Sequence, residues 1–211
     1  MNRLLCLIIS MLLLPVSCLK DMPEELPADL VWEPELAIPV GKDRFGLDAE
    51  SGFDTTLFDL DTITELPLWA GRMDVVLTGY VDFDLSSIEA STDNINGILF
   101  RVGIFNAFPD AVLAQAYFYN GTQPLDSLFS EGPIPVAAGT PLADGESCRP
   151  SVLRQDALLN RERIPLISSA NMLVFKALVL EPGLDTSLIP YYRNYYIESE
   201  LGCMLDLKIE F

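Results

Sequence analysis

Several stretches of this 211-residue chain alternate apolar and polar residues with a period of two. The longest runs from Tyr195 to Phe211, with mostly apolar residues at odd positions and mostly polar residues at even ones. A strand with this period buries one face and leaves the other in water, as antiparallel sheets do. The pattern therefore favours packed β-sheets over a helical fold, and Gly202 within it predicts a β-bulge.

Further segments show the same alternation or a strand-like composition, and turn signals separate them. They are residues 77–85, 98–105, 112–119, 134–137 and 172–180. Residues 165–171 and 125–129 favour short helical turns, and residues 152–159 fit either a helix or a strand. We expect a mainly β chain, an antiparallel immunoglobulin-like sandwich with one or two short helices.

The charge of the chain limits its partners. It carries 31 Asp and Glu residues against 13 Lys and Arg, while half of its residues are hydrophobic. That hydrophobic share suits a packed globule. Nucleic acid is excluded as a partner, because phosphate binding needs clustered Lys and Arg. Direct adhesion to an anionic lipid surface is disfavoured for the same reason.

The sequence contains no histidine. The usual Ser-His-Asp and Cys-His nucleophiles are therefore excluded, as are His-based zinc and iron sites. We expect no metal, no cofactor and no enzymatic activity. A pair of carboxylates could still hydrolyse glycosides without histidine, but no pair of acids stands out in an apolar setting.

The N-terminus has the form of a signal peptide. Arg3 precedes an apolar run from Leu4 to Leu14, which is too short to span a membrane, and Ser17 precedes Cys18. This segment resembles a bacterial lipoprotein signal, although Pro15 stands where leucine is usual. The resemblance implies that Cys18 is acylated and becomes the new N-terminus, which anchors the chain to a membrane. The alternative is ordinary secretion with cleavage near Ser17.

Residues 18–40 are acidic and rich in proline, which is typical of an extended tether. The acidic run after Cys18 resembles the surface-export signal of Bacteroidota lipoproteins, and Val31–Val40 resembles the opening of a group of uncharacterised Bacteroidota lipoproteins. These resemblances imply an outer-membrane lipoprotein. Display on the cell surface, a periplasmic location and secretion all stay open. The expected organisation is a signal peptide at 1–17, a lipid-anchored tether at 18–40 and one β-rich domain at 41–211.

A strand, an Asn-x-x-Pro turn at Asn106–Pro109 and a second strand follow one another between residues 75 and 140. This order resembles the β-sandwich of late-embryogenesis-abundant and water-stress proteins. The resemblance implies a non-catalytic domain.

Two further groups of residues are candidate sites. Cys148 and Cys203 remain once Cys18 is acylated, and they either form a disulfide or serve as two separate small core residues. The candidate residues for stacking against sugar rings are Tyr191, Tyr192, Tyr195 and Tyr196. Packing across strands is the alternative use of such tyrosines.

The sequence thus predicts a non-catalytic lipoprotein of the cell envelope that binds a glycan or another envelope protein. The first alternative is a structural subunit of a surface appendage, in which the C-terminal strand is donated to a neighbour. The second is a glycosidase that uses a pair of carboxylates.

Overall fold

The computed structural model describes residues 31–32, 35–47, 58–60, 67–69, 75–84, 94–180, 185–207 and 209–210. Cys18, the signal segment and most of the tether lie outside these residues. The chain divides into two compact units. In the first, β1 (Val31–Trp32) pairs with β15 (Ile209–Glu210) in antiparallel fashion. The second unit, residues 33–208, contains everything described below.

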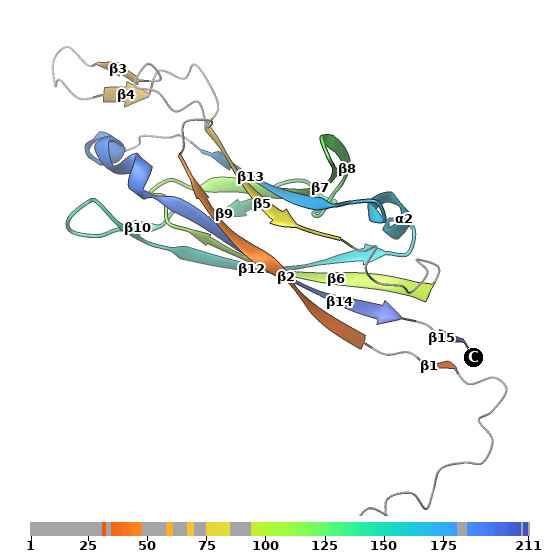
Figure 1. Cartoon of the computed structure of the whole chain (residues 1–211). Helices are drawn as coiled ribbons and strands as arrows, with labels where there is room; N and C mark the ends of the chain where they lie inside the picture. Colours follow the sequence, from red (N-terminus) through yellow and green to blue (C-terminus); the bar gives the residue numbers. More distant parts are fainter. Residues whose placement is uncertain are drawn as a thin grey trace, which may run out of the picture. The chain divides into compact units, whose positions relative to one another are not determined.

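Two antiparallel sheets pack face to face in the second unit (Figure 1). The four-stranded sheet has the order β12 (Ser151–Asn160), β6 (Ile95–Asn106), β14 (Tyr196–Leu207) and β2 (Glu35–Gly46). The five-stranded sheet has the order β5 (Val75–Asp82), β13 (Met172–Val179), β7 (Val112–Asn120) and β8 (Gln123–Ser127), and β9 (Ile134–Val136) also pairs with β7. Two smaller pairs are β3 (Phe58–Leu60) with β4 (Pro67–Trp69) and β10 (Thr140–Pro141) with β11 (Cys148–Arg149). The helices are α2 (Ile164–Ile167) and the 3₁₀ helix η4 (Thr186–Asn194).

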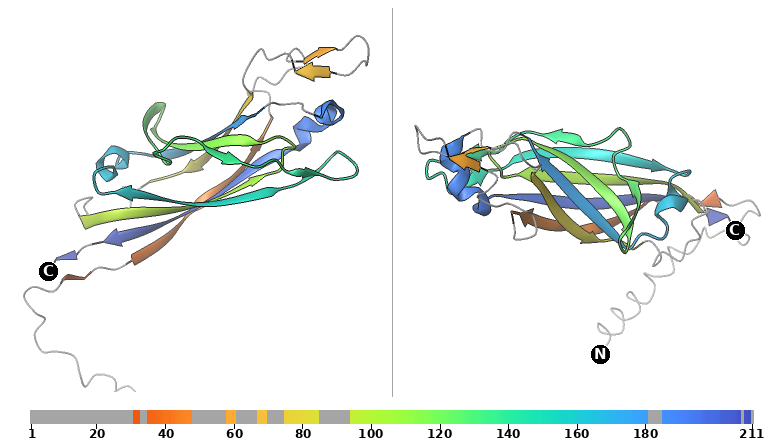
Figure 2. Two further views of the ribbon diagram at one scale, coloured as in Figure 1. Left: turned by 180° about the vertical axis from the view of Figure 1, so that it is seen from behind. Right: turned by 90° about the horizontal axis from the view of Figure 1, so that it is seen from above.

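The predicted fold class, a mainly β antiparallel sandwich with short helices, is confirmed. The order in which the chain enters the two sheets defines the topology of the sandwich further. The long strands alternate between the sheets, from β2 to β5, β6, β7, β12, β13 and β14 (Figure 2). This alternation gives a jelly roll. In an immunoglobulin-type sandwich, by contrast, the first two strands lie in one sheet.

The core lies between the two sheets, because the strands alternate as the sequence predicts. In β14, Ile197, Leu201 and Leu205 are buried, and their even-numbered neighbours face outward. Phe83, Phe100 and Phe118 pack together with ring centroids 5.2–5.8 Å apart, and they join strands from both sheets. Strand β14 pairs with β6 on one side and β2 on the other, so this strand stays within its own sheet.

The two sheets come close together where β2 meets β5. Gly79 on β5 is buried against the ring of Phe45 on β2, and a β-carbon at Gly79 would lie 2.1 Å from that ring. The Asp43 carboxylate accepts a hydrogen bond from Tyr80 N at 2.7 Å. This bond satisfies a backbone donor at the edge of the five-stranded sheet. At this corner the missing side chain of Gly79 lets the two strands approach closely, and the Asp43 carboxylate links them by its hydrogen bond to Tyr80 N.

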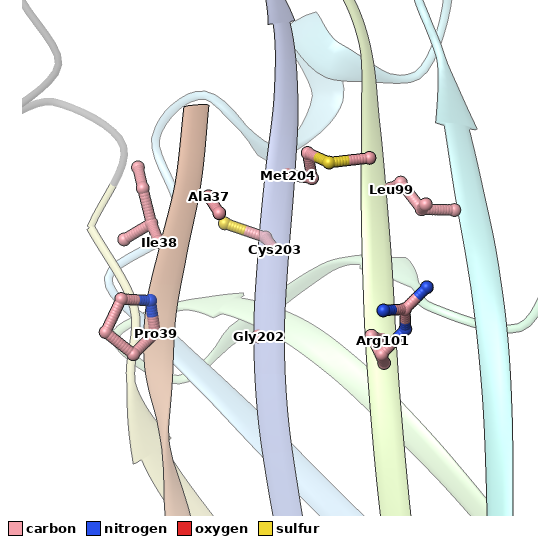
Figure 3. A pocket seen from close by; sticks show the side chains of 8 residues that line it. All are labelled: Ala37, Ile38, Pro39, Leu99, Arg101, Gly202, Cys203 and Met204. Carbon is pink, nitrogen blue, oxygen red and sulfur yellow. The ribbon is translucent and has the colours of Figure 1, made fainter. Parts of the chain in front are cut away.

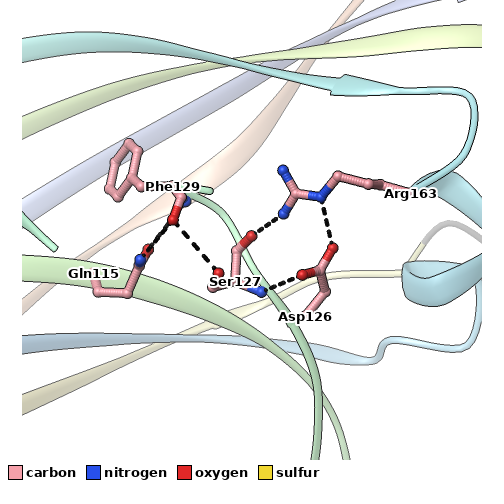
Figure 4. Close-up of polar contacts among 5 residues, drawn as sticks. All are labelled: Gln115, Asp126, Ser127, Phe129 and Arg163. Atoms are coloured by element: carbon pink, nitrogen blue, oxygen red, sulfur yellow. Dashed lines mark hydrogen bonds and ion pairs between the residues drawn. The ribbon is translucent and has the colours of Figure 1, made fainter. Parts of the chain in front are cut away.

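A polar network holds the interruption between β8 and β9 (Figure 4). Both strands pair with β7, and between them the buried side chain of Gln115 adds to the single backbone bond from Leu128 N to Ala116 O. Its amide donates to Phe129 O at 2.8 Å and accepts from Phe129 N at 3.0 Å. Arg163, just before α2, donates to the Asp126 carboxylate at 2.9 Å and to Ser127 O. The prediction of a helical turn at 125–129 is wrong, because these contacts keep residues 123–127 extended beside β7.

The other uncertain elements are resolved by pairing. Residues 152–159 form a strand, because β12 pairs with β6 along its whole length. The helix expected from residue 165 is the single turn α2, with Pro165 in its first turn. The bulge expected at Gly202 lies instead on the facing strand: the register between β14 and β2 shifts between Leu201 and Gly202, and the extra residue is Val40 of β2. Strand β2 begins at Glu35, so residues 35–39, assigned to the tether above, pair with β14.

Candidate functional site

The outward face of the four-stranded sheet carries a shallow groove across β2, β14 and β6. One part, of about 290 Å³, is lined mainly by apolar side chains, including Ala37, Leu99 and Met204. A second part, of about 460 Å³, adjoins it and is lined by charged side chains. The parts share Pro39, Arg101 and Gly202, and their volumes are in the range of ligand sites in proteins.

The register of the strands explains this division. Leu158, Leu99 and Met204 lie side by side across β12, β6 and β14, and Ala37 continues the row on β2. In Figure 3, Leu99 and Arg101 follow one another along β6, and Gly202 leaves a gap between Pro39 and Arg101. An apolar row thus lies beside a charged region on the same face.

Glycine forms part of the groove floor on two adjacent strands. Gly103 lies opposite Glu200, and Gly202 lies opposite Arg101. A β-carbon at Gly202 would meet only Ile38 O at 3.8 Å, and one at Gly103 would come no closer than 3.4 Å to Phe105. Larger side chains would therefore fit the sandwich, although glycine weakens a strand interior. Gly202 thus leaves the floor open, whereas Gly103 is buried beside the side chains of Phe105 and Glu200.

The charged part of the groove contrasts with the acidic chain around it. Exposed Lys42, Arg101 and Arg154 line it together with Glu200. Arg101 donates two hydrogen bonds of 3.1 Å to the Asp156 carboxylate. These bonds lower the pKa of Asp156 and raise the pKa of Arg101. Arg101 therefore keeps its charge in the groove, where the Asp156 carboxylate orients its guanidinium.

Apart from Cys203, which lines the apolar part and was considered only for a disulfide, none of the groove residues was predicted as a site from the sequence. The sequence signal that could have found them is the pair Gly103 and Gly202. Each stands at an outward position of a strand in which apolar and polar residues alternate. Glycine inside a strand marks a bulge or a place where another chain or ligand comes close. The strand pairing that places the two glycines beside each other cannot be read from that signal.

The predicted tyrosine cluster is mostly part of the core. Tyr192 and Tyr195 are 1% and 2% exposed and pack against Phe108, with ring centroids 6.2 and 5.9 Å from it. These two rings therefore offer no stacking face to a ligand. Tyr191 is half-buried against the core, and the ring of Tyr196 is covered by the guanidinium of Arg44 at 4.1 Å. Packing, the alternative named above, is the role of Tyr192 and Tyr195.

The hydroxyl groups of the buried tyrosines hold loops in place. Tyr192 donates to the Asp110 carboxylate, which is 2% exposed, and Tyr195 donates to Gly145 O. Burial, with nearby negative groups, raises the pKa of Tyr195 to about 12. Its phenol therefore stays a hydrogen-bond donor at any physiological pH.

Cys148 and Cys203 are two separate thiols. Cys203 lies opposite Phe100, whereas Ser151, shortly after Cys148, lies opposite Asn106 at the end of β6. At about 3.3 Å per residue these positions are about 20 Å apart along the strand, and a disulfide needs α-carbons within about 7 Å. Burial raises the pKa of each thiol to about 11.

Neither a metal site nor a membrane-spanning helix is found in the described part of the chain. It holds no group of three or more His, Cys, Asp and Glu side chains that could bind a metal ion. It also holds no helix that is both long and apolar enough to cross a membrane. Cys18, the predicted lipidation site, lies outside the described residues.

Comparisons with known proteins find distant likenesses in fold alone. No family model matches the chain, and no curated protein matches it either. A Parabacteroides distasonis protein described as secreted is similar with a TM-score of 0.41 and 9% identity, over 63% of this chain and 38% of that one. An infectious bursal disease virus structure (Gx strain) gives a TM-score of 0.37 at 9% identity, over 83% and 33%. The K1 adhesin domain of Lys-gingipain from Porphyromonas gingivalis gives 0.32 at 12% identity, over 83% and 96%.

Proposed function

We propose that this chain is a non-catalytic binding module of the cell envelope, and that its groove holds an extended, acidic segment of a partner protein. The observation that carries the proposal is the groove floor. Gly202 leaves space that the packing of the sandwich does not require, since a β-carbon there would meet only Ile38 O at 3.8 Å. Lys42, Arg101 and Arg154 beside this space form a cationic border on a chain with a formal net charge of −18.

The lining of the groove favours a polypeptide over a glycan. Sugar sites in proteins commonly present an aromatic face, and the rings of Tyr192 and Tyr195 are buried. The apolar row that includes Ala37, Leu99 and Met204 can instead take the apolar side chains of an extended segment. Acidic side chains of the same segment would then meet Lys42 and Arg101.

The groove can be tested with a synthetic peptide. We expect a fluorescent twelve-residue peptide of alternating Glu and Val to bind, and a Lys-Val peptide of the same length not to bind. Gly202→Leu fills the floor, and Lys42→Glu reverses a charge at its border. Each should weaken binding by about tenfold or more in fluorescence anisotropy, and added salt should weaken binding to the parent chain.

Glu146→Lys serves as a matched control, because this exposed acid lies in the loop between β10 and β11 and does not line the groove. It should leave the affinity unchanged. Equal binding of the Lys-Val peptide would contradict the charge argument. Tighter binding of an anionic polysaccharide, polygalacturonate, that is lost in Gly202→Leu would replace the protein partner by a glycan.

The module would be held at the outer membrane by a lipid on Cys18, with residues 19–34 as spacer. A thiol that follows the apolar run of a signal peptide is the basis for this part of the proposal. We expect the wild-type chain to incorporate labelled palmitate in a bacterial host and Cys18→Ala to incorporate none. Cys6→Ala is the matched control and should keep the label. Equal labelling of wild type and Cys18→Ala would remove the anchor but leave the groove proposal intact.

A further inference from the structure

Strand β12 forms an edge of the four-stranded sheet. It pairs with β6 along one side, and no described strand pairs with its other side. Its outward face carries Val152 and Leu158, which are 53% and 66% exposed. Proteins normally protect a long edge strand and avoid large apolar side chains there, since such an edge pairs readily with another strand. This edge therefore has the character of an interface.

The sequence of β12 is complementary to itself when read in the opposite direction. If two copies run antiparallel with Gln155 opposite Gln155, Arg154 of each copy lies opposite Asp156 of the other. Val152 then lies opposite Leu158. We propose that two copies of this chain form a symmetric dimer by pairing their β12 strands in this register.

Neighbouring registers are worse. Moving the two-fold axis by one residue places two like charges opposite each other. With the axis at Arg154, Val152 also faces Asp156, and with the axis at Asp156, Leu158 faces Arg154. Like charges directly opposite on paired strands are destabilising, whereas opposite charges and apolar pairs contribute favourably. The side-chain order of β12 therefore selects the axis at Gln155.

The charged side chains Arg154 and Asp156 on this edge can form ion pairs with a second copy of the strand. Arg154 is exposed and makes no ion pair with any residue that the structure describes. Asp156 is 46% exposed in its side chain and is already oriented by Arg101. Its carboxylate can accept further hydrogen bonds, so it can also receive Arg154 of the second copy. Because the contact is symmetric, this pair forms twice in each dimer.

The occupant of the edge is therefore a second copy of this chain. A contact of one edge with the same edge is closed by its two-fold axis, so it ends at a dimer and does not grow into a filament. It would join the two four-stranded sheets into one continuous sheet and cover Val152 and Leu158.

Analytical ultracentrifugation of the full chain carrying Cys18→Ala, which removes any lipid, tests this pairing. We expect the parent to sediment as a dimer at micromolar concentration. Arg154→Asp and Asp156→Arg each place like charges across the axis and should raise the dimer dissociation constant by about tenfold or more. The double swap restores opposite charges across the axis and should return the constant to within about threefold of the parent value.

Arg193→Asp, the same change of charge on η4, should leave the dimer unchanged. Circular dichroism should show the same fold in every variant. A parent that stays monomeric at about 100 µM, which is roughly tenfold above the concentration at which we expect the dimer, would overturn the proposal. So would a double swap that is as weak as the single variants, since loss of the Arg101–Asp156 pair would then explain the effect.

Discussion

Replacing Gly79 by alanine is expected to lower the free energy of unfolding by about 2–3 kcal/mol, in the upper part of the range of about 1–3 kcal/mol for overpacking a core. The added β-carbon would lie 2.1 and 2.5 Å from two atoms of the Phe45 ring and 2.8 Å from an Asp43 carboxylate oxygen. Phe45 is 9% exposed and packed in the core, so the ring cannot move aside freely. The bond from Tyr80 N to Asp43 should weaken as well.

Urea unfolding followed by circular dichroism measures this effect. Gly97→Ala is the matched control, because a β-carbon there meets its nearest atoms at 3.6 and 3.7 Å, an ordinary contact. It should leave stability unchanged or raise it slightly. In a Phe45→Ala background, Gly79→Ala should cost much less than in the parent. An equal cost in both backgrounds would show that the ring is not the obstacle.

Replacing Asn106 by alanine is expected to cost about 3 kcal/mol or more, because several buried polar groups lose their partner at once. Asn106 is fully buried, and its amide donates to Asp110 O at 2.9 Å and Ala137 O at 2.8 Å. Its side-chain oxygen accepts from Phe108 N at 2.9 Å. One side chain thus fixes the turn between β6 and β7 and ties it to the segment after β9.

Two further variants separate hydrogen bonding from packing at this position. Asn106→Asp keeps the shape but places a carboxylate against two carbonyl oxygens, so it should be at least as destabilising as alanine. Asn160→Ala, at the exposed end of β12, should change stability by less than about 0.5 kcal/mol. A loss below about 1 kcal/mol for Asn106→Ala in urea unfolding would mean that water replaces the lost bonds.

Much of the fold follows from local pattern. Alternation in β5, β6, β7 and β14 predicts these strands, because a half-buried strand needs apolar residues on one face only. The turn at Asn106–Asp110 is also readable, since turn residues have characteristic backbone preferences, whereas the bulge expected at Gly202 lies at Val40 on β2. The absence of histidine excludes the same chemistries before and after folding.

The strand order and the candidate site depend on contacts between residues far apart in the sequence. Nothing local to β2 or β14 indicates that they pair, and this pairing places Pro39 beside Gly202 and leaves the groove between Lys42 and Arg101. Burial likewise decided the roles of Tyr192, Tyr195 and the two thiols, because each ring or thiol meets its neighbours only after the sheets close. In β5, β6, β7 and β14 the sequence by itself determined which residues face the core and which face outward. Only the tertiary structure decided which outward residues share a surface, because that depends on the register between strands.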